Sequence, residues 1–365
     1  MRIAFYAPMK PPTSDVPSGD RRMARLLIRA LEFSGHDVHL ACDFQSREPA
    51  GDPVRQQEIM GLGQSVAETL IAAYENGEAA RPDAWFTYHL YYKAPDWIGP
   101  SVANRLGIPY VVAEASHAPK RAWGPWDLNH RQAEAAIRRA DRVFGLNTLD
   151  AGCIKPLLAT PDKLVQMKPF LDLDDMPPVP DRRENSDKPV RLVAAAMMRS
   201  GDKLESYGVL AAALKRLPED AWALEVAGDG PERPSVEEMF AGLPVTFLGE
   251  LSAKDLYAAF DRADLFVWPA VNEAYGMALL EAQSRGLPVV AGRTHGVPDI
   301  VRDGITGKLA AVGDADAFAR AVRELIEQPD DLPKMSDAAR QTVAAEHSLE
   351  TAAAILDREI RAVAA

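Results

Sequence analysis

The 365-residue chain contains only two cysteines, Cys42 and Cys153, in dissimilar surroundings. Such sparse cysteines predict reduced, buried thiols and exclude a disulfide framework or a cysteine zinc site. No apolar run approaches the ~20 residues that span a membrane. The first residues reach Pro8 before a signal-peptide core could form. These absences predict a cytoplasmic protein.

The sequence also has no excess of basic over acidic residues. The net charge is −12, with 20 basic and 19 acidic residues in 1–170, and 21 basic and 34 acidic residues in 171–365. An acidic C-terminal half repels nucleic-acid backbones, so a phosphate bound there must meet a small local cluster of donors. Nucleic-acid binding is therefore not expected. The stretch GDGP (228–231) completes neither G-x-G-x-x-G nor a Walker lysine sequence, which disfavours a dehydrogenase or a kinase.

Strand-like runs alternate with helical patterns along the first half of the chain. Apolar residues recur at helical spacing between Gly19 and Gly35, and further helical stretches lie near 97–106 and before Arg139. The strand-like runs are RIAFYA (2–7), VHLA (38–41), AWFTYH (84–89), IPYVVAEA (108–115) and RVFGLN (142–147). This alternation predicts an α/β domain with a parallel sheet.

A Pro- and charge-rich segment, 172–189, interrupts the alternation as a linker between domains does. Strand-like runs then return at 190–196, 222–228, 245–249, 265–270 and 288–292. We therefore expect Rossmann-like domains over 1–171 and 190–348, with the final helix (349–365) packing back on the first domain. Two doubly wound domains would face each other across a cleft, with ligands at the carboxyl ends of the strands.

The segment 271–292 runs from a strand end through a loop into a helix and carries two carboxylates, Glu273 and Glu281. Glu273 precedes the helix, where it can reach a sugar. Between Tyr275 and Met277, Gly276 allows close backbone approach at the helix start, where N–H groups form an anion site. Glu281, two turns further on, is placed to accept hydrogen bonds from ribose hydroxyls.

Arg199 and Lys203 follow the first strand of the second domain. They supply two cations in an otherwise acidic domain. A departing diphosphate develops negative charge, and preorganised cations stabilise that charge most where water is excluded.

These pieces, in this order, resemble the retaining GT-B glycosyltransferases of the large family four, the glycosyl transferases group 1. The matching stretches are the Arg199/Lys203 loop, AGDGPER (227–233), VTFLGEL (245–251), ADLFVWP (263–269), the Glu273 to Glu281 segment and GVPDIVRDGITGKL (296–309). Weaker matches in the first half are PSGDRRMARLLIRALEFSGHDV (17–38), IPYVVAEASH (108–117) and RRADRVFGLN (138–147).

The resemblance implies a nucleotide-sugar donor, a UDP- or GDP-sugar, held mainly by the second domain. Arg199 and Lys203 would contact the diphosphate, Glu281 the ribose and Glu273 the transferred sugar. Gly19 would lie near the phosphate and His117 near the sugar. The resemblance implies no metal, and the Asp172/Asp174 pair lies in the linker.

Several features have ordinary structural interpretations. His117 follows a strand and precedes a Trp-rich loop, which favours a functional role, although a structural histidine stays an alternative. The structural interpretation is preferred for His36, His39, His89, His130 and His295. Aromatic residues of 87–93 and 117–126 could stack on a sugar or pack as a lid. The basic stripe Arg21, Arg22, Arg25 and Arg29 is a solvated helix face, with weak contact to the inner face of an anionic membrane as the alternative.

The predicted function is transfer of a sugar, with retention, to a hydroxyl acceptor that is a saccharide, a lipid-linked compound or a small molecule. A sugar-nucleotide epimerase on the same scaffold is the nearest enzymatic alternative. A non-catalytic nucleotide-sugar-binding protein is the alternative from another class. A hydrolase is disfavoured because it needs two carboxyls flanking one bond.

Overall fold

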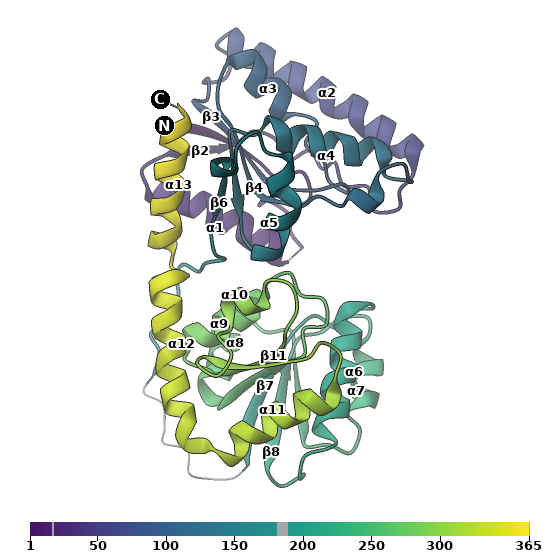
Figure 1. Cartoon of the computed structure of the whole chain (residues 1–365), viewed down its shortest axis with the longest axis vertical. Coiled ribbons are helices and arrows are strands. Elements are labelled where there is room, and N and C mark those ends of the chain that lie inside the picture. The colour runs from purple at the N-terminus through teal and green to yellow at the C-terminus, as the bar shows by residue number, and fades with distance from the viewer. Residues whose placement is uncertain (17, 181–188, 365) are drawn as a thin grey trace. The chain divides into compact units, whose positions relative to one another are not determined.

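The computed structural model describes residues 1–16, 18–180 and 189–364. It divides into two compact units (Figure 1). Unit 1 comprises Met1–Pro169 together with Leu349–Ala365, and unit 2 comprises Phe170–Ser348. Unit 1 thus ends two residues before the boundary expected at 171, and the described part of the expected linker, 172–180 and 189, belongs to unit 2. Residues 181–188 of that linker lie outside the described residues.

Unit 1 is built on a parallel six-stranded sheet in the order β2-β1-β3-β4-β5-β6. Its strands are β1 (Arg2–Tyr6), β2 (Asp37–Leu40), β3 (Ala84–Leu90), β4 (Tyr110–Ala115), β5 (Arg142–Gly145) and β6 (Leu164–Gln166). Its helices are α1 (Gly19–Phe33), α2 (Pro53–Glu75), α3 (Gly99–Leu106), α4 (Asp127–Arg139), α5 (Thr148–Ile154) and α13 (Leu349–Ala364). The expected doubly wound α/β class is confirmed for this unit.

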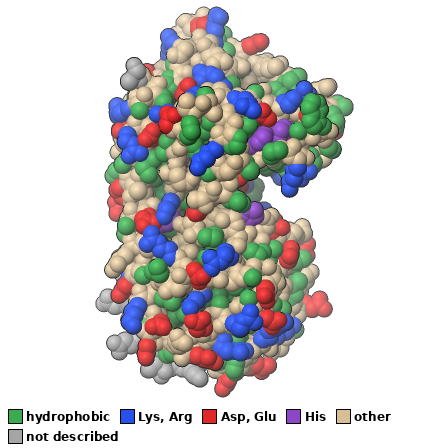
Figure 2. All heavy atoms as spheres, in the orientation of Figure 1, with side chains coloured by type: hydrophobic (Ala, Val, Ile, Leu, Met, Phe, Trp, Pro, Cys, Tyr) green, Lys and Arg blue, Asp and Glu red, His purple; other side chains and the backbone are tan. Residues whose placement is uncertain are grey.

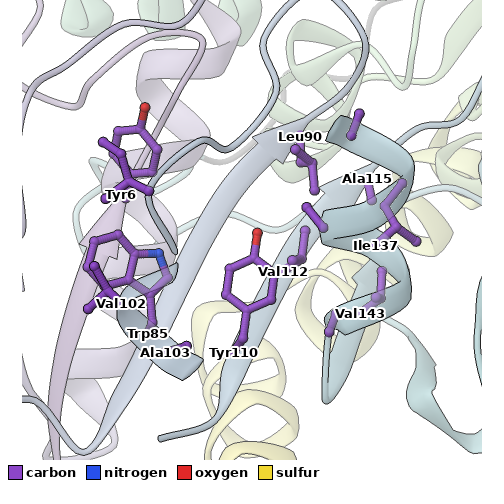
Figure 3. Packing of buried hydrophobic residues seen from close by; sticks show 14 of the residues in the cluster. Tyr6, Trp85, Leu90, Val102, Ala103, Tyr110, Val112, Ala115, Ile137 and Val143 are labelled. Carbon is purple, nitrogen blue, oxygen red and sulfur yellow. The ribbon is translucent and has the colours of Figure 1, made fainter. Parts of the chain in front are cut away.

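The two faces of the first sheet are covered by different side chains because neighbouring residues of a strand point to opposite faces. On one face Tyr6, Trp85 and Tyr110 pack with residues of α2, α3 and α4, as Figure 3 shows for part of this cluster. Phe5 and Phe86 stack with ring centroids 5.5 Å apart. Burial of such rings on both faces is a large share of the apolar area that stabilises the unit.

The C-terminal helix α13 packs against α1 (Figure 1). Ser34, just after α1, donates a hydrogen bond to the carbonyl of Ala353 at 3.1 Å. The buried His36 lies 3.0 Å from Asp357, and Arg142 of β5 pairs with Glu359 at 3.1 Å. The last element of the chain is therefore an integral helix of unit 1.

Unit 2 contains a second parallel six-stranded sheet, in the order β12-β11-β10-β7-β8-β9. Its strands are β7 (Val190–Ala195), β8 (Trp222–Ala227), β9 (Val245–Gly249), β10 (Leu265–Trp268), β11 (Val289–Gly292) and β12 (Gly307–Ala310). Its helices are α6 (Asp202–Leu214), α7 (Arg233–Met239), α8 (Ala253–Arg262), α9 (Met277–Ser284), α10 (Val297–Ile300), α11 (Ala315–Glu327) and α12 (Leu332–Glu346).

The described start of the expected linker is fastened to unit 2 by one buried arginine. Arg285 forms a bidentate ion pair with Asp261, at 2.8 and 2.6 Å. The same guanidinium donates hydrogen bonds to the carbonyls of Pro177 and Pro178. A planar guanidinium has enough donors to serve all these acceptors at once.

Acidic and basic side chains are interspersed over the face drawn in Figure 2. Within the described residues, no helix is both long and apolar enough to cross a membrane. Both cysteines are free; Cys42 is half-buried and burial raises the pKa of its thiol to about 11. Cys153 is exposed on the short helix α5, so the expectation that both thiols are buried is wrong for this residue.

Candidate functional site

The strand order of unit 2 reverses beside β7. From β7 the chain moves outward through β8 to β9, and it then returns to place β10 on the other side of β7. The loops that follow β7 and β10 diverge at their carboxyl ends, which is where open α/β sheets bind ligands. The loop with Arg199 follows β7, and the Glu273 to Glu281 segment follows β10.

Lys203 and Glu273 meet at this point. Lys203 lies in the first turn of α6, and its ammonium forms an ion pair with the Glu273 carboxylate. The ammonium also lies 5.5 Å from the ring centroid of Trp268, the last residue of β10. The side chains of Lys203 and Glu273 are 19% and 22% exposed, so both remain within reach of a ligand.

Hydrogen bonds fasten the loop after β10 to the start of α6. The Asn272 amide donates to the Asp202 carboxylate at 2.8 Å. The backbone N–H of Val271 donates to the Ser206 hydroxyl at 3.1 Å. The two diverging loops therefore hold the Lys203 and Glu273 side chains at a fixed separation.

Gly276 caps the N-terminus of α9 with a positive φ of 76°. A Cβ atom here would lie 2.9 Å from Leu279 and 3.1 Å from Glu273, so a larger residue is disfavoured by space as well as by φ. In the described part of the chain, no side chain caps this helix start. Its first N–H groups thus suit an anion. Tyr275 is buried beside Gly276, and Met277 is partly exposed.

Glu281 lies in the second turn of α9 and is only 4% exposed. Tyr257 of α8 donates a long hydrogen bond of 3.5 Å to its carboxylate. A carboxylate accepts strong hydrogen bonds from hydroxyl groups, so this position suits the hydroxyls of a ligand. Arg199 is exposed in the loop after β7.

Close packing explains why the GDGP stretch (228–231) contains glycines. A Cβ atom at Gly228 would lie 1.9 Å from the carbonyl oxygen of Ala196, and one at Gly230 would lie 2.2 Å from that of Met198. Between them, the Asp229 carbonyl accepts a hydrogen bond from the Met198 N–H at 2.8 Å. These glycines let the loop after β8 lie against the loop that carries Arg199.

The remaining predicted residues, Gly19 and His117, lie in unit 1. Gly19 begins α1, where Ser18 accepts a hydrogen bond from the N–H of Arg21 at 3.2 Å. His117, in the loop after β4, has its Nε2 3.2 Å from a carboxylate oxygen of Glu134 on α4. The structure therefore groups Arg199, Lys203, Glu273, Tyr275, Gly276, Met277 and Glu281 in unit 2, and it places the other two in unit 1.

Two arginines of the predicted basic stripe hold the loop before α1. Arg21 donates to the carbonyls of Ser14 and Asp15 at 2.9 and 3.1 Å. Arg25 donates to the carbonyl of Pro12 at 2.8 Å. These two side chains act within the fold, in addition to lying on the outer face of α1.

Sequence reasoning missed a charged cluster in unit 1. His89, at the end of β3, lies 3.0 Å from Asp20 and 4.0 Å from Glu114 of β4. Asp20 belongs to the helix that follows β1, and β1 neighbours β3 where this sheet reverses its strand order. His89 and Glu114 both have positive φ, 60° and 57°, which is uncommon for residues other than glycine and concentrates at functional sites. The aromatic run around His89 was the available signal.

Burial alone lowers the pKa of His89, but the charge of Glu114 and the hydrogen bond and charge of Asp20 overcome it and raise the pKa to about 9. The imidazole is therefore protonated at neutral pH and is held between two carboxylates. Asp20 correspondingly has a lowered pKa: its burial is outweighed by the hydrogen bond and the charge of His89.

The two aromatic segments of unit 1 meet one another. Tyr92 and Trp126 have ring centroids 5.5 Å apart, and the Arg121 guanidinium lies 4.8 Å from the Trp126 ring. Trp123, in contrast, is 91% exposed. Packing accounts for the first three residues, and Trp123 is the ring that a ligand could reach.

Comparison with known proteins finds similar sequences and similar structures. The family model described as "Glycosyl transferases group 1" matches residues 189–328. The sulfoquinovosyl transferase SQD2 of Arabidopsis thaliana is 29% identical over 66% of this chain and 49% of its own length. A GDP-mannose-dependent alpha-(1-6)-phosphatidylinositol monomannoside mannosyltransferase of Mycolicibacterium smegmatis is 28% identical over 64% of each chain. A D-inositol 3-phosphate glycosyltransferase of Streptomyces coelicolor is 26% identical over 76% of this chain and 70% of its own length.

The matched part of this chain thus spans between about half and 70% of the length of these relatives. Among solved structures, sucrose-phosphate synthase of Thermosynechococcus elongatus has a TM-score of 0.74 at 19% identity, over 99% of this chain and 98% of that one. Anabaena HepE in complex with UDP-glucose has a TM-score of 0.70 at 16% identity, over 99% of this chain and 100% of that one. The likeness to these structures confirms the GT-B fold class.

Proposed function

We propose that this chain, whose residues 189–328 match the model described as "Glycosyl transferases group 1", transfers a sugar from a nucleotide-sugar donor to a hydroxyl acceptor with retention of anomeric configuration. The observation that carries this is the meeting of the Lys203 ammonium and the Glu273 carboxylate at the reversal point of the second sheet, in the loop that leads into α9 with its buried Glu281. A nucleotide-sugar donor requires a cation for its diphosphate, a carboxylate that reaches its sugar and a group that accepts hydrogen bonds from its ribose.

Each donor-binding residue has a chemical role in this proposal. Lys203 and Arg199 bind the diphosphate, which the N–H groups at the start of α9 also approach. Glu281 accepts hydrogen bonds from the ribose hydroxyls, and Glu273 binds hydroxyls of the transferred sugar. Tyr275 and Met277 shape the segment around Gly276. Lys203 exchanges its partner Glu273 for the diphosphate when the donor binds.

The chemical step breaks the bond between the anomeric carbon and the diphosphate oxygen. The acceptor oxygen forms the new bond to that carbon, and its proton passes to the departing diphosphate. Lys203 and Arg199 stabilise the negative charge of the leaving group as it develops. The step uses no enzymatic nucleophile and no metal.

The donor is a UDP- or GDP-sugar. The solved HepE complex contains UDP-glucose, and the name of the mycobacterial relative specifies GDP-mannose. The acceptor is a saccharide, a lipid-linked compound or a small molecule. Gly19 would lie near the phosphate of the donor and His117 near its sugar. The charged cluster of His89, Asp20 and Glu114 adds carboxylates able to bind acceptor hydroxyls.

The first experiment is a thermal-shift screen of UDP-, GDP- and ADP-sugars, followed by turnover with a library of acceptors. Glu281→Gln and Arg199→Ala should abolish the stabilisation given by one nucleotide class. Glu238→Gln, an exposed glutamate of α7, is the matched control and should leave it unchanged.

The outcomes separate the candidate functions. Donor binding with product formation supports transfer. Conversion of the donor sugar into its epimer, without an acceptor, would replace transfer by epimerisation. Donor binding without any turnover across the acceptor library would favour a binding protein. A stabilisation that survives Glu281→Gln would remove the ribose role from that residue.

A further inference from the structure

Unit 1 contains a cluster of three potential metal ligands outside the donor segment. His117 follows β4, while His130 and Glu134 are four residues apart on α4 and therefore share one face of that helix. One ligand atom from each residue can be chosen so that all three lie within 4.8 Å of one another. A pair of ligands at this helical spacing is a recurring part of zinc sites.

The buried side chain of His130 is independent evidence that this cluster binds a further group. The residue is 3% exposed, and neither of its ring nitrogens has a hydrogen-bond partner among the described residues. Its ring faces that of His117, with centroids 4.8 Å apart. Buried polar atoms usually have a partner, so two open nitrogens beside a second imidazole and a carboxylate suit a bound cation.

The arrangement suits a cation better than a further hydrogen-bonding group. A neutral imidazole offers a lone pair to a metal. The Nε2 of His117 lies 3.2 Å from Oε2 of Glu134, close to the roughly 3.3 Å between two ligands on a tetrahedral zinc with bonds of about 2.0 Å.

Glu134 is also oriented for this role. Its other oxygen, Oε1, accepts a hydrogen bond from Arg138 at 2.9 Å. That bond fixes the carboxylate and leaves Oε2 directed at His117. Partners of this kind commonly orient metal ligands in proteins.

We propose that His117, His130 and Glu134 bind a divalent transition metal of the zinc class, with a fourth position open to water. Two imidazoles and one carboxylate are ligands that zinc accepts readily. The metal would fasten the loop after β4 to α4. It takes no part in the transfer step, and it is independent of the proposed donor site. His117 then binds the metal, and its predicted contact with the sugar is the competing assignment.

The test uses the full chain, freed of metal by a chelator and titrated with Zn²⁺ alone by calorimetry. We expect one equivalent to bind and to raise the Tm. Co²⁺ should give the visible absorption bands of a tetrahedral complex. His130→Gln and Glu134→Gln should each weaken binding at least tenfold. His39→Gln is the control, since His39 is another imidazole of unit 1 and contacts Tyr74 at 3.3 Å.

The alternatives give different results. Absence of saturable Zn²⁺ binding, or equal binding by wild type and both ligand variants, would overturn the metal site. Equal loss in His39→Gln would place the metal elsewhere and overturn it as well. If His130→Gln does not fold, Glu134→Gln still decides, because the Glu134 side chain is 30% exposed and its amide analogue preserves its shape. If the wild type shows no affinity for Zn²⁺ and His117→Gln lowers the transfer rate, His117 is assigned to the sugar.

Discussion

Lys203 is the residue whose removal most directly tests stabilisation of the leaving group. Its ammonium pairs with Glu273 and lies over Trp268. A preorganised donor at a developing charge contributes roughly 3 kcal/mol, or about a hundredfold in rate. We expect Lys203→Met to lower kcat about a hundredfold with the donor found by the screen. The Tm should change little, because both partners are partly exposed.

Steady-state kinetics measure this effect, and Lys254→Met is the control because Lys254 is an exposed lysine of α8. The control should retain the kcat of the wild type. An unchanged kcat in Lys203→Met would exclude Lys203 from leaving-group stabilisation. A rise in KM alone would assign it to uniform binding of the donor.

His89 should make the stability of unit 1 depend on pH. Its pKa of about 9 in the folded chain exceeds the ordinary histidine value of 6.5. A raised pKa means that protonation stabilises the folded state fully below pH about 6.5, and that this stabilisation is lost as the pH rises through about 9. The Tm of the wild type should therefore fall more steeply over this window than that of His89→Gln. Parallel curves from thermal unfolding would contradict the pairing with Asp20 and Glu114.

Single site residues could be proposed where one stretch of sequence contains the chemistry. Glu273, Gly276 and Glu281 lie within one loop and helix, so their joint role could be proposed without tertiary structure. His89 could not be recognised, because its partners come from α1 and β4 and meet it only in the folded sheet. His130 was missed for the same reason, since its significance depends on facing His117.

At the scale of elements, long apolar runs predicted the central strands, whereas two short strands with polar residues were not predicted. The edge strands β6 and β12 have three and four residues, and β12 contains Gly307 and Lys308, which weaken a strand pattern. Helix α2 was also missed. Its buried positions include Gln56 and Gly63 among few large apolar residues, so it lacks a clear apolar stripe.

Gly228 is required by the close approach of two loops. Its φ is 135°, and a Cβ atom would lie 1.9 Å from the carbonyl oxygen of Ala196. Gly228→Ala must displace the loop after β7, which contains Arg199. We expect a lower Tm and weaker donor binding, measured by thermal unfolding and by calorimetric titration.

Gly208→Ala is the matched control in the same unit. Gly208 lies inside α6, and a Cβ atom there has no neighbour within 4 Å. Replacing a helix-interior glycine by alanine should stabilise the protein by about 0.5–1 kcal/mol. Donor binding as tight in Gly228→Ala as in this control would show that the loop contact does not shape the site.

At the scale of the whole molecule, the sequence predicted two α/β folds because a Pro- and charge-rich segment separates two sets of strands. It could not predict how the chain enters and leaves unit 2. Leu171 and His347 lie side by side, joined by a hydrogen bond of 2.9 Å from the Leu171 N–H to the His347 carbonyl. The two ends of unit 2 are thereby held together, a pairing of residues that no local pattern records.

The return of α13 to unit 1 leads to a test of how far the two units are independent. Leu356 of α13 is fully buried, and truncating such a leucine removes about 2–5 kcal/mol of stability. We expect Leu356→Ala to lower the unfolding temperature of unit 1 in calorimetry. Because the contacts proposed for the ribose and most of those proposed for the diphosphate lie in unit 2, the donor Kd measured below that temperature should stay unchanged. Ala354→Ser, at an exposed position of the same helix, should alter neither quantity. A weakened donor Kd in folded Leu356→Ala would mean that α13 transmits the state of unit 1 to the donor site.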